Sequence, residues 1–193
     1  MTMLDLPGAV ERVDWLIAEG LVVDSPRADR VRAYAVDTRD SVSLHFRRIV
    51  IDAIDSCLRI EEGLQVAAVA NSGTLLCAMW AGATGNSFWN ALVDGPRSRG
   101  FGRDLEPASG VLGGRFVLVD NHARSGASLR AAREIIESHG GSVACAMVFT
   151  AGDQVNADIP LYVALPHGLI LHALACPAES RDEPQVRRKA DAR

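Results

Sequence analysis

The residues best suited to bind a ligand lie in the segment 116–128, FVLVDNHARSGAS. A β-branched apolar run ends at Asp120, a short loop of small and polar residues follows, and a helical pattern, LRAAREIIESHGG, then closes on a glycine pair. N–H groups in the first turn of a helix lack intrahelical acceptors and lie at the positive end of the helix dipole. A strand, loop and helix of this kind can therefore bind a phosphate.

The side chains of this segment fit the same chemistry. Gly126 lets the chain approach an anion closely, and Ser125 and Ser128 add hydroxyl donors. Asp120 stands at the C-terminal end of the strand, where open α/β sheets bind ligands, and can accept hydrogen bonds from sugar hydroxyls. The alternative is a plain strand, loop and helix with a serine N-cap, which occurs in many α/β proteins that bind nothing there.

The order of residues resembles the phosphoribosyl diphosphate (PRPP) loop of type I phosphoribosyltransferases. That loop has an apolar strand, two acidic residues, three variable positions and then Thr/Ser-Gly-x-Ser/Thr. The matching residues are Asp120, Asn121, His122, Ala123, Arg124, Ser125, Gly126, Ala127 and Ser128. The resemblance implies that they bind PRPP, although Asn121 replaces the second acidic residue.

Two further segments resemble orotate phosphoribosyltransferases, so that the likeness extends from the first helix to about Ala151. AYAVDTRDSVSLHF is similar to that family's Tyr-x-x-Asp-x-Arg segment, and VAAVANSGTLL is similar to its diphosphate loop. The resemblance implies that backbone N–H groups of the second segment bind the diphosphate of PRPP, while a plain helix N-cap at Ser72 or Thr74 is the alternative. The residues concerned are Tyr34, Asp37 and Arg39 in the first segment and Ala70, Asn71, Ser72, Gly73 and Thr74 in the second.

A long glycine-rich segment, 94–110, lies where that family has a mobile basic loop that closes over the neighbouring active site of a dimer. The resemblance therefore implies a homodimer and a catalytic role for Arg97, Arg99 and Arg103. Arginine can hold a diphosphate through paired hydrogen bonds but does not exchange a proton near neutral pH. We expect these side chains to stabilise the charge of the leaving group and not to act as general acids.

Other positions differ from the family. The Asp-Arg pair whose arginine holds the orotate carboxylate falls at Thr150 and Ala151, and Asp24 and Ser25 occupy the region of an expected lysine. The base is therefore expected not to be orotate. His122 could contact a ribose or act as an acid, and the alternative is a solvated loop histidine. Trp89 could line a base pocket or pack against other apolar side chains, whereas Trp80 is expected in the hydrophobic core.

Composition favours one soluble domain. The chain has 193 residues, of which 48% are hydrophobic, and we expect a domain over residues 1–178 and a disordered charged tail over 179–193. The net charge of -4 argues against nucleic acid as a partner. Scattered cysteines without a C-x-x-C pair, no signal-peptide pattern and no membrane-length apolar run predict a reduced, cytoplasmic protein without a membrane partner.

The apolar spacing predicts alternating strands and helices. Helices are expected at 10–19, 46–58, 74–83 and from 129, a hairpin or irregular strand pair at 21–37, and strands at 64–70, 87–93, 116–120, 142–151 and 160–165. This alternation predicts an α/β fold with a mostly parallel sheet covered by helices on both faces. The resemblance implies the type I phosphoribosyltransferase version of that fold, with a small hood.

The resemblance implies transfer of ribosyl 5-phosphate from PRPP to a nitrogenous base, with release of diphosphate. Mg²⁺ is expected as a cofactor carried mainly by PRPP, with no protein residue as a metal ligand. Because several positions tied to catalysis or orotate recognition differ, the alternative is a non-catalytic PRPP- or nucleotide-binding regulatory or partner module on the same fold.

Overall fold

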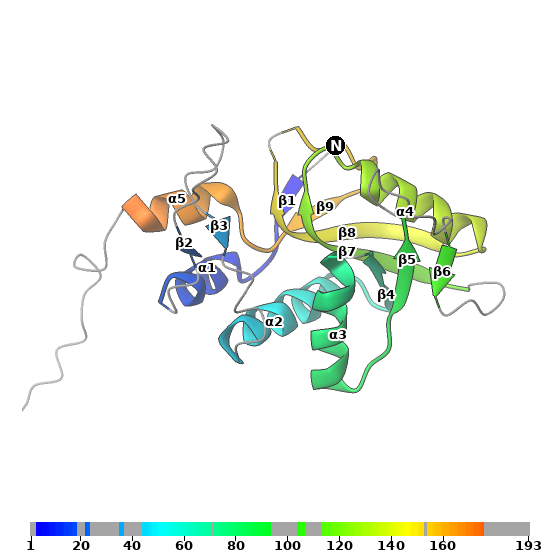
Figure 1. Cartoon of the computed structure of the whole chain (residues 1–193), viewed down its shortest axis with the longest axis horizontal. Coiled ribbons are helices and arrows are strands. Elements are labelled where there is room, and N and C mark those ends of the chain that lie inside the picture. The colour runs from blue at the N-terminus through cyan, green and yellow to red at the C-terminus, as the bar shows by residue number, and fades with distance from the viewer. Residues whose placement is uncertain are drawn as a thin grey trace, which may run out of the picture.

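The computed structural model describes residues 3–18, 22–23, 35–36, 44–70, 72–93, 104–106, 113–152 and 154–175. Strands and helices follow one another along most of this length (Figure 1). In chain order they are β1 (Met3–Asp5), α1 (Ala9–Ala18), β2 (Val22–Val23), β3 (Ala35–Val36), α2 (Leu44–Ile60), β4 (Leu64–Val69), α3 (Ser72–Thr84), β5 (Trp89–Leu92), β6 (Asp104–Glu106), β7 (Arg115–Ala123), α4 (Ala127–Ser138), β8 (Ser142–Ala151), β9 (Leu161–Val163) and α5 (His167–Ala175).

The main sheet has the strand order β1-β9-β8-β7-β4-β5-β6 in the described part of the chain. Neighbouring strands run parallel except β6, which pairs antiparallel with β5 at the edge. The mostly parallel sheet predicted from the sequence is confirmed. The long strands β7 and β8 form its centre, and β2 pairs with β3 in a separate antiparallel pair, as the pattern at 21–37 predicted.

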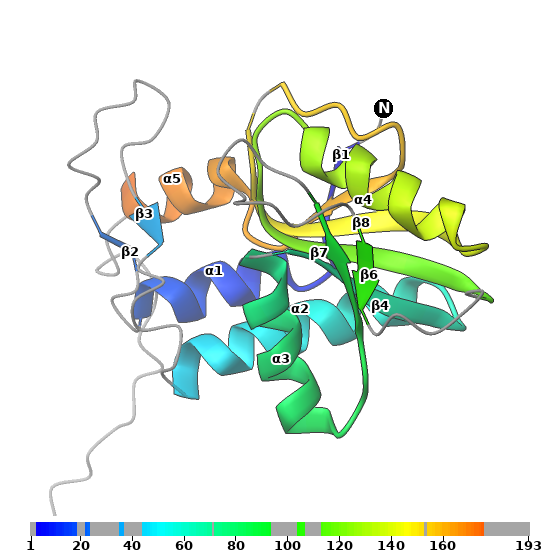
Figure 2. The same ribbon diagram turned by 45° about the vertical axis from the view of Figure 1, so that its right-hand side comes forward.

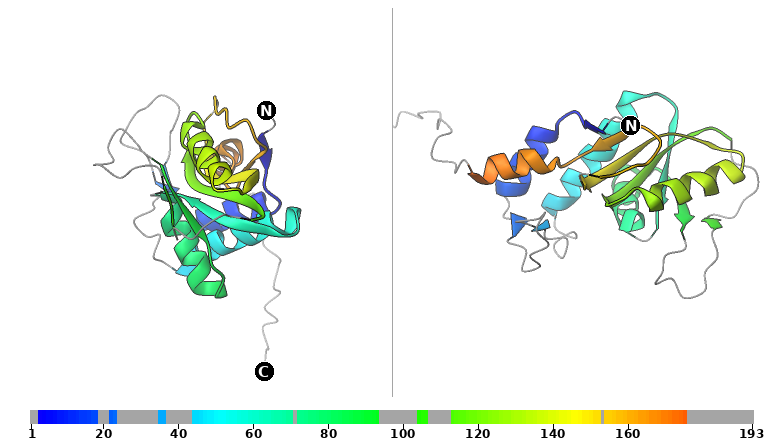
Figure 3. Two further views of the ribbon diagram at one scale, coloured as in Figure 1. Left: turned by 90° about the vertical axis from the view of Figure 1, so that its right-hand side faces the viewer. Right: turned by 90° about the horizontal axis from the view of Figure 1, so that it is seen from above.

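Helices cover both faces of this sheet. Helix α4 lies on one face, and α1, α2 and α3 lie on the other (Figures 2 and 3). Alternate residues of β7 point into the two cores: Phe116 and Leu118 pack with α4, whereas Val117 and Val119 pack with the helices of the opposite face. A central strand that is buried on both faces has a continuous run of apolar residues. This is why the sequence of residues 116–119 predicts a strand.

The N-terminal helix α1 is held by a buried arginine. Arg12 is fully buried, and its Nη1 donates to Asp52 Oδ2 of α2 over 2.7 Å. Its Nε donates to the carbonyl oxygen of Ala164, just after β9, over 3.1 Å, and its Nη2 donates to the carbonyl oxygens of Leu6 and Pro7. The buried charge is thereby fully paired and fixes α1 to α2 and to the end of β9.

Several boundaries differ from the sequence-based expectation. Strand β7 does not end at Asp120 but continues to Ala123, because His122 and Ala123 still pair with Thr150 and Ala151 of β8. Part of the segment 94–110, expected to be a loop, forms β6. Strand β1 and helix α5 were not expected, since one is three residues long and the other is short and apolar on nearly every side.

Other expectations fall outside the described residues. They concern Tyr34, Asp37, Arg39, Asn71, the arginines Arg97, Arg99 and Arg103, Asp24, Ser25 and the tail at 179–193. Within the described part, no helix is both long and apolar enough to cross a membrane. The cysteines Cys57, Cys77 and Cys145 are buried free thiols there, and burial raises the pKa of Cys77.

Candidate functional site

The candidate site lies where the C-terminal ends of β4 and β7 meet the N-terminal ends of α3 and α4. β4 and β7 are neighbours in the sheet, with Ala68 opposite Val119. Along the chain β4 is followed by α3, and β7 leads into α4 through the connection at residues 124–126. Because the strands are parallel, both helix N-termini come to the same edge of the sheet.

Asp120 is the charged residue at the centre of this edge. Its side chain is buried, with 5% of its surface exposed. Its Oδ1 accepts a hydrogen bond from the Ser72 hydroxyl over 2.5 Å and another from the backbone N–H of Asn121 over 2.7 Å. Burial raises the pKa of the Asp120 carboxyl above its ordinary value, and the two hydrogen bonds offset part of that rise.

Gly73 allows the first turn of α3 to touch the end of β7. A Cβ on this residue would collide with the carbonyl oxygen of Val119 and approach the Asp120 Cα to 3.4 Å. Any larger residue must therefore push the helix away from the strand. The close approach made possible by Gly73 brings the Ser72 hydroxyl within reach of Asp120.

The first turn of α4 encloses a small cavity together with the loop before it. The cavity measures about 110 Å³ and is lined by Asp120, His122, Ala123, Arg124, Ser125, Gly126, Ala127, Ser128 and Leu129. Eight of the nine residues matched to the PRPP loop are among these, and Asn121 is the exception. The segment expected to bind one ligand group thus surrounds one cavity.

The loop before α4 does not use a serine N-cap. Gly126 is the N-cap, with a left-handed backbone (φ 80°) and no side-chain cap hydrogen bond, and Ser125 Oγ reaches the Ala127 N–H only at 3.5 Å. The first bond from the helix to Gly126 is made by the N–H of Arg130. The amides of residues 127–129 therefore have no acceptor within their own helix, which leaves them suited to an anion.

The residues that the resemblance assigns to the diphosphate do not all lie in the same element. Ser72, Gly73 and Thr74 form the first turn of α3, beside the cavity residue Asp120. The N–H of Ala70, in contrast, donates to the carbonyl oxygen of Ala91 over 3.0 Å. The expectation that Ala70 presents its N–H to a ligand is therefore wrong for this conformation, because strand pairing with β5 continues one residue beyond β4.

His122 pairs with Thr150 at the ends of β7 and β8. The two residues are opposite each other in the sheet, and His122 Nδ1 lies 2.8 Å from Thr150 Oγ1. Ala151 follows at the end of β8, opposite Ala123. The position at the end of β8 where the resemblance implies an arginine therefore carries a methyl group, beside the Thr150 hydroxyl that pairs with His122.

Solved structures of phosphoribosyltransferases are similar to this chain in fold. No protein-family model and no curated protein sequence matches the chain. Orotate phosphoribosyltransferase from Aeropyrum pernix matches with a TM-score of 0.65 and 19% identity, covering 84% of this chain and 97% of that one. The chain has the type I phosphoribosyltransferase fold.

Two other structures with the phosphoribosyltransferase fold were solved with ligands. Orotate phosphoribosyltransferase from Mycobacterium tuberculosis, in complex with PRPP, matches with a TM-score of 0.57 and 15% identity over 85% of this chain and 99% of that one. Adenine phosphoribosyltransferase from Saccharomyces cerevisiae, complexed with adenine and an iminoaltritol bisphosphate, matches with a TM-score of 0.60 and 16% identity over 80% and 99%. Similarity at these sequence identities establishes the fold alone, so an activity has to be argued from the residues of the site.

Sequence reasoning missed three residues that shape this phosphoribosyltransferase-fold site. Asn90 on β5 accepts the Thr74 hydroxyl through Oδ1 over 2.6 Å. Arg130 on α4 donates to the carbonyl oxygens of Ser125 and Asn156. Asn90 was detectable as a polar residue inside an apolar strand pattern, but Arg130 resembles any solvated helix residue, and Asn156 lies in a connection without a recognisable pattern.

Two tryptophans considered from the sequence, Trp80 and Trp89, both pack in the fold. Trp89 packs edge-on against Phe116, with ring centroids 6.5 Å apart, and therefore lies toward the opposite end of β7 from Asp120. It packs and does not line the candidate site. Trp80 belongs to the core, as expected. Among the described residues, no group of three or more His, Cys, Asp or Glu side chains is arranged to hold a metal ion.

Proposed function

We propose that this protein binds PRPP and transfers its ribosyl 5-phosphate to a nitrogenous base, releasing diphosphate. The observation that carries the proposal is the hydrogen bond between Ser72 and Asp120, which places the first turn of α3 beside the carboxylate that also lines the cavity at the N-terminus of α4. Each helix N-terminus suits a phosphate, and the carboxylate between them suits sugar hydroxyls. PRPP is a ribose with a 5-phosphate at one end and a diphosphate at the other. It therefore matches a site with a phosphate-binding helix N-terminus on each side of a carboxylate.

The roles of individual residues follow from that order. The loop and first turn at 125–128 bind the 5-phosphate, and Asp120 with Asn121 binds the ribose hydroxyls. The first turn of α3, residues 72–74 together with Asn71, binds the diphosphate. Arg97, Arg99 and Arg103 stabilise the negative charge of the leaving diphosphate, as the resemblance implies.

Mg²⁺ is proposed to bind to the protein as a complex with PRPP. The described residues of the site offer a single carboxylate, Asp120, and its Oδ1 already accepts two hydrogen bonds. Mg²⁺ keeps several waters and binds readily to substrate phosphates, so diphosphate and ribose oxygens supply most of its ligands. Its contribution is to neutralise the charge of the leaving group.

The base is proposed to be one without a carboxylate. Thr150 and Ala151 supply no cation at the end of β8, and the only lysine of the chain is Lys189. A carboxylate that is desolvated without a cation binds poorly. Adenine, guanine, uracil and their analogues are therefore better candidates than orotate.

We further propose a homodimer in the cytoplasm. The resemblance implies that the segment 94–110 closes over a neighbouring site, and two-fold dimers are the commonest soluble oligomers. Light scattering coupled to gel filtration measures the mass directly. A monomer at working concentration would leave the loop arginines without a neighbouring site and remove this part of the proposal.

A second candidate function is PRPP or nucleotide binding without catalysis. It is favoured by Asn121, which replaces one of the two acidic residues of the family motif, and by the burial of Asp120. Such a site can retain phosphate binding while failing to stabilise the transition state. Product formation from PRPP and Mg²⁺ with a panel of bases separates the two functions, because only the enzyme releases diphosphate in a base-dependent way.

Binding is tested by calorimetry with PRPP and Mg²⁺. The wild-type protein is expected to bind, and Asp120→Ala to bind about 1.5 to 3 kcal/mol more weakly, because a charged hydrogen bond to the ribose is lost. Asp5→Ala on β1, an exposed carboxylate, is the matched control and should bind as the wild type does. Absence of PRPP binding by the wild-type protein would overturn the proposed function in both forms.

A further inference from the structure

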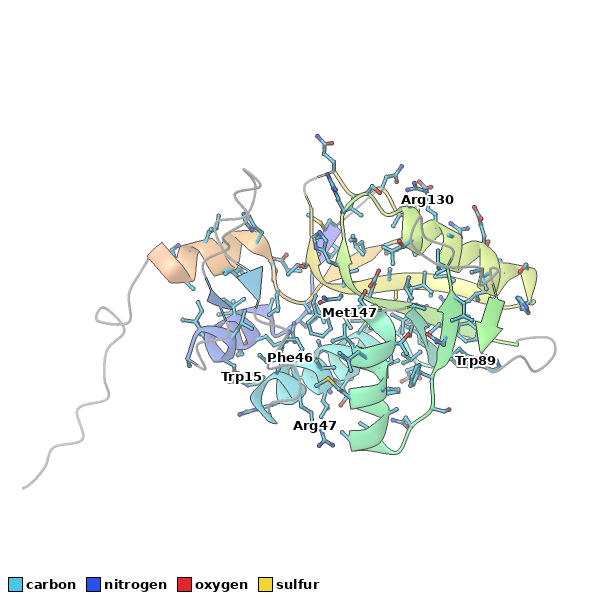
Figure 4. All side chains as sticks on the ribbon, viewed as in Figure 1. Trp15, Phe46, Arg47, Trp89, Arg130 and Met147 are labelled. Carbon is cyan, nitrogen blue, oxygen red and sulfur yellow. The ribbon has the colours of Figure 1, made fainter. Side chains whose placement is uncertain are left out.

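Arg130 connects the loop before α4 to the connection between β8 and β9. Its Nη1 donates to the carbonyl oxygen of Ser125 over 3.3 Å and to the carbonyl oxygen of Asn156. The backbone N–H of Asn156 donates in turn to the same Ser125 carbonyl over 3.2 Å. Figure 4 shows Arg130 on α4, and Figure 2 shows the connection passing beside that helix. Three hydrogen bonds thus close a small ring around Ser125.

The β8–β9 connection also supports the glycine of the loop. A Cβ on Gly126 would collide with the carbonyl oxygen of Asn156, so the two backbones are in direct contact. The connection is itself fixed, because Ala157 is fully buried among the residues that pack with α4. The Asp158 N–H also lies 3.4 Å from Asn156 Oδ1. The loop therefore rests on a segment that is anchored in the core through Ala157.

We propose that Arg130 is a positioning residue of the phosphate site. It holds the carbonyl groups of Ser125 and Asn156 together, and this keeps the amides of residues 127–129 directed at one anion. The inference rests on the proposed function, since it assigns the 5-phosphate of PRPP to this loop. Preorganised donors bind more tightly than donors that must be ordered by the ligand, so loosening the loop should lower affinity for the phosphate end of the substrate.

An alternative role for Arg130 is purely electrostatic, and two substitutions separate the roles. Arg130→Lys keeps the positive charge, but its ammonium nitrogen is one bond closer to the backbone than Nη1 and lacks the fixed plane in which the two N–H groups of Nη1 are held. Arg130→Met removes the charge and keeps most of the apolar stem. A positioning role predicts that both variants lose affinity, whereas a charge effect predicts that Arg130→Lys keeps it.

Arg133 offers the matched control on the same helix. It lies three residues further along α4, pairs with Glu137 Oε1 over 2.7 Å and donates to the carbonyl oxygen of Asp158 over 3.3 Å. Arg133→Met therefore removes the same charge and a contact with the same connection, but it breaks no bond to Ser125 or Asn156. Its binding affinities should match those of the wild type.

The test measures two probes, ribose 5-phosphate and inorganic diphosphate, by calorimetry with Mg²⁺. Arg130→Met and Arg130→Lys are expected to bind ribose 5-phosphate about 10- to 100-fold more weakly and to bind diphosphate unchanged. The amide resonance of Gly126 in the ¹H–¹⁵N spectrum should shift when ribose 5-phosphate binds to the wild type, and this shift should shrink in both variants. Gly126→Ala should show the same selective loss, since it displaces the loop from Asn156.

The outcomes are distinguishable. Full ribose 5-phosphate affinity in Arg130→Lys would overturn the positioning role in favour of charge alone. Equal losses for both probes, or the same loss in Arg133→Met, would show a general effect on the fold and overturn it as well. If the wild-type protein binds neither probe nor PRPP, the proposed function is overturned and this inference with it. If the wild-type protein binds ribose 5-phosphate and Arg130→Met binds it equally well, only the inference is overturned.

Discussion

The Ser72 hydroxyl donates a 2.5 Å hydrogen bond to Oδ1 of the buried Asp120 carboxyl. This bond joins the first turn of α3 to the C-terminal part of β7, although the two residues are 48 positions apart in the chain. It also connects the proposed diphosphate site to the proposed ribose site. The first two predictions follow from this pair.

Asp120→Asn is expected to raise the free energy of unfolding at pH 7. Burial raises the pKa of Asp120 above its ordinary value of 3.8, so ionisation of this group opposes folding. Its stabilising contribution is fully present below pH 3.8 and is lost as the pH rises through the raised pKa. Asparagine keeps an oxygen acceptor for Ser72 and for the Asn121 amide without the buried charge.

Denaturant titrations of both proteins from pH 3.5 to 8 check this expectation. The difference in unfolding free energy, variant minus wild type, should increase with pH and level off above the raised pKa. PRPP binding should weaken at the same time, because an amide is a poorer acceptor for ribose hydroxyls than a carboxylate. A difference that is independent of pH would mean that Asp120 does not titrate abnormally.

Ser72→Ala should destabilise the protein by about 1.5 to 3 kcal/mol at pH 7, since a buried carboxylate loses one of its donors. In the Asp120→Asn background the same change should cost only about 0.5 to 1.5 kcal/mol, because a neutral acceptor is less demanding. Thermal or denaturant unfolding of the four proteins of the double-mutant cycle gives the coupling energy. A coupling energy near zero would contradict the Ser72–Asp120 hydrogen bond.

Gly73→Ala and Gly82→Ala should have opposite effects on stability although both lie on α3. Alanine in a helix is favoured over glycine by about 0.5 to 1 kcal/mol, and a Cβ at Gly82 meets nothing within 4 Å. At Gly73 the Cβ collides with the Val119 carbonyl, and overpacking of this kind costs about 1 to 3 kcal/mol. Melting temperatures test the pair, and stabilisation by both substitutions would show that α3 does not approach β7 closely.

Orotate should be a poor substrate or none. Thr150 and Ala151 provide no cation for its carboxylate at the end of β8, and the Thr150 hydroxyl is already paired with His122. The assay follows the loss of orotate absorbance with PRPP and Mg²⁺. Rapid turnover by the wild type would mean that another arginine holds the carboxylate. Ala151→Arg, in contrast, should increase orotate use, with Ala151→Gln as the uncharged control.

The sequence was sufficient for the parts of the site that are continuous along the chain. The apolar run of β7 and the small residues at 125–128 predicted a strand, a loop and a helix N-terminus, because strand burial and helix-end chemistry depend on local residue types. Where β7 ends was not predictable, since the additional residues pair through backbone hydrogen bonds with β8. Backbone hydrogen bonds between strands do not change the pattern of apolar and polar residues in the sequence.

The sequence by itself determined the α/β fold class, because it follows from local periodicity, and the resemblance to the PRPP loop pointed to residues that line one cavity. Only the tertiary structure decided which distant groups meet there: Ser72 with Asp120, Thr74 with Asn90, His122 with Thr150, and Arg130 with the carbonyls of Ser125 and Asn156. It also placed the Ala70 amide in a hydrogen bond with the carbonyl oxygen of Ala91. Such contacts depend on strand order and register, which bring segments tens of residues apart to one edge and cannot be read from any single segment.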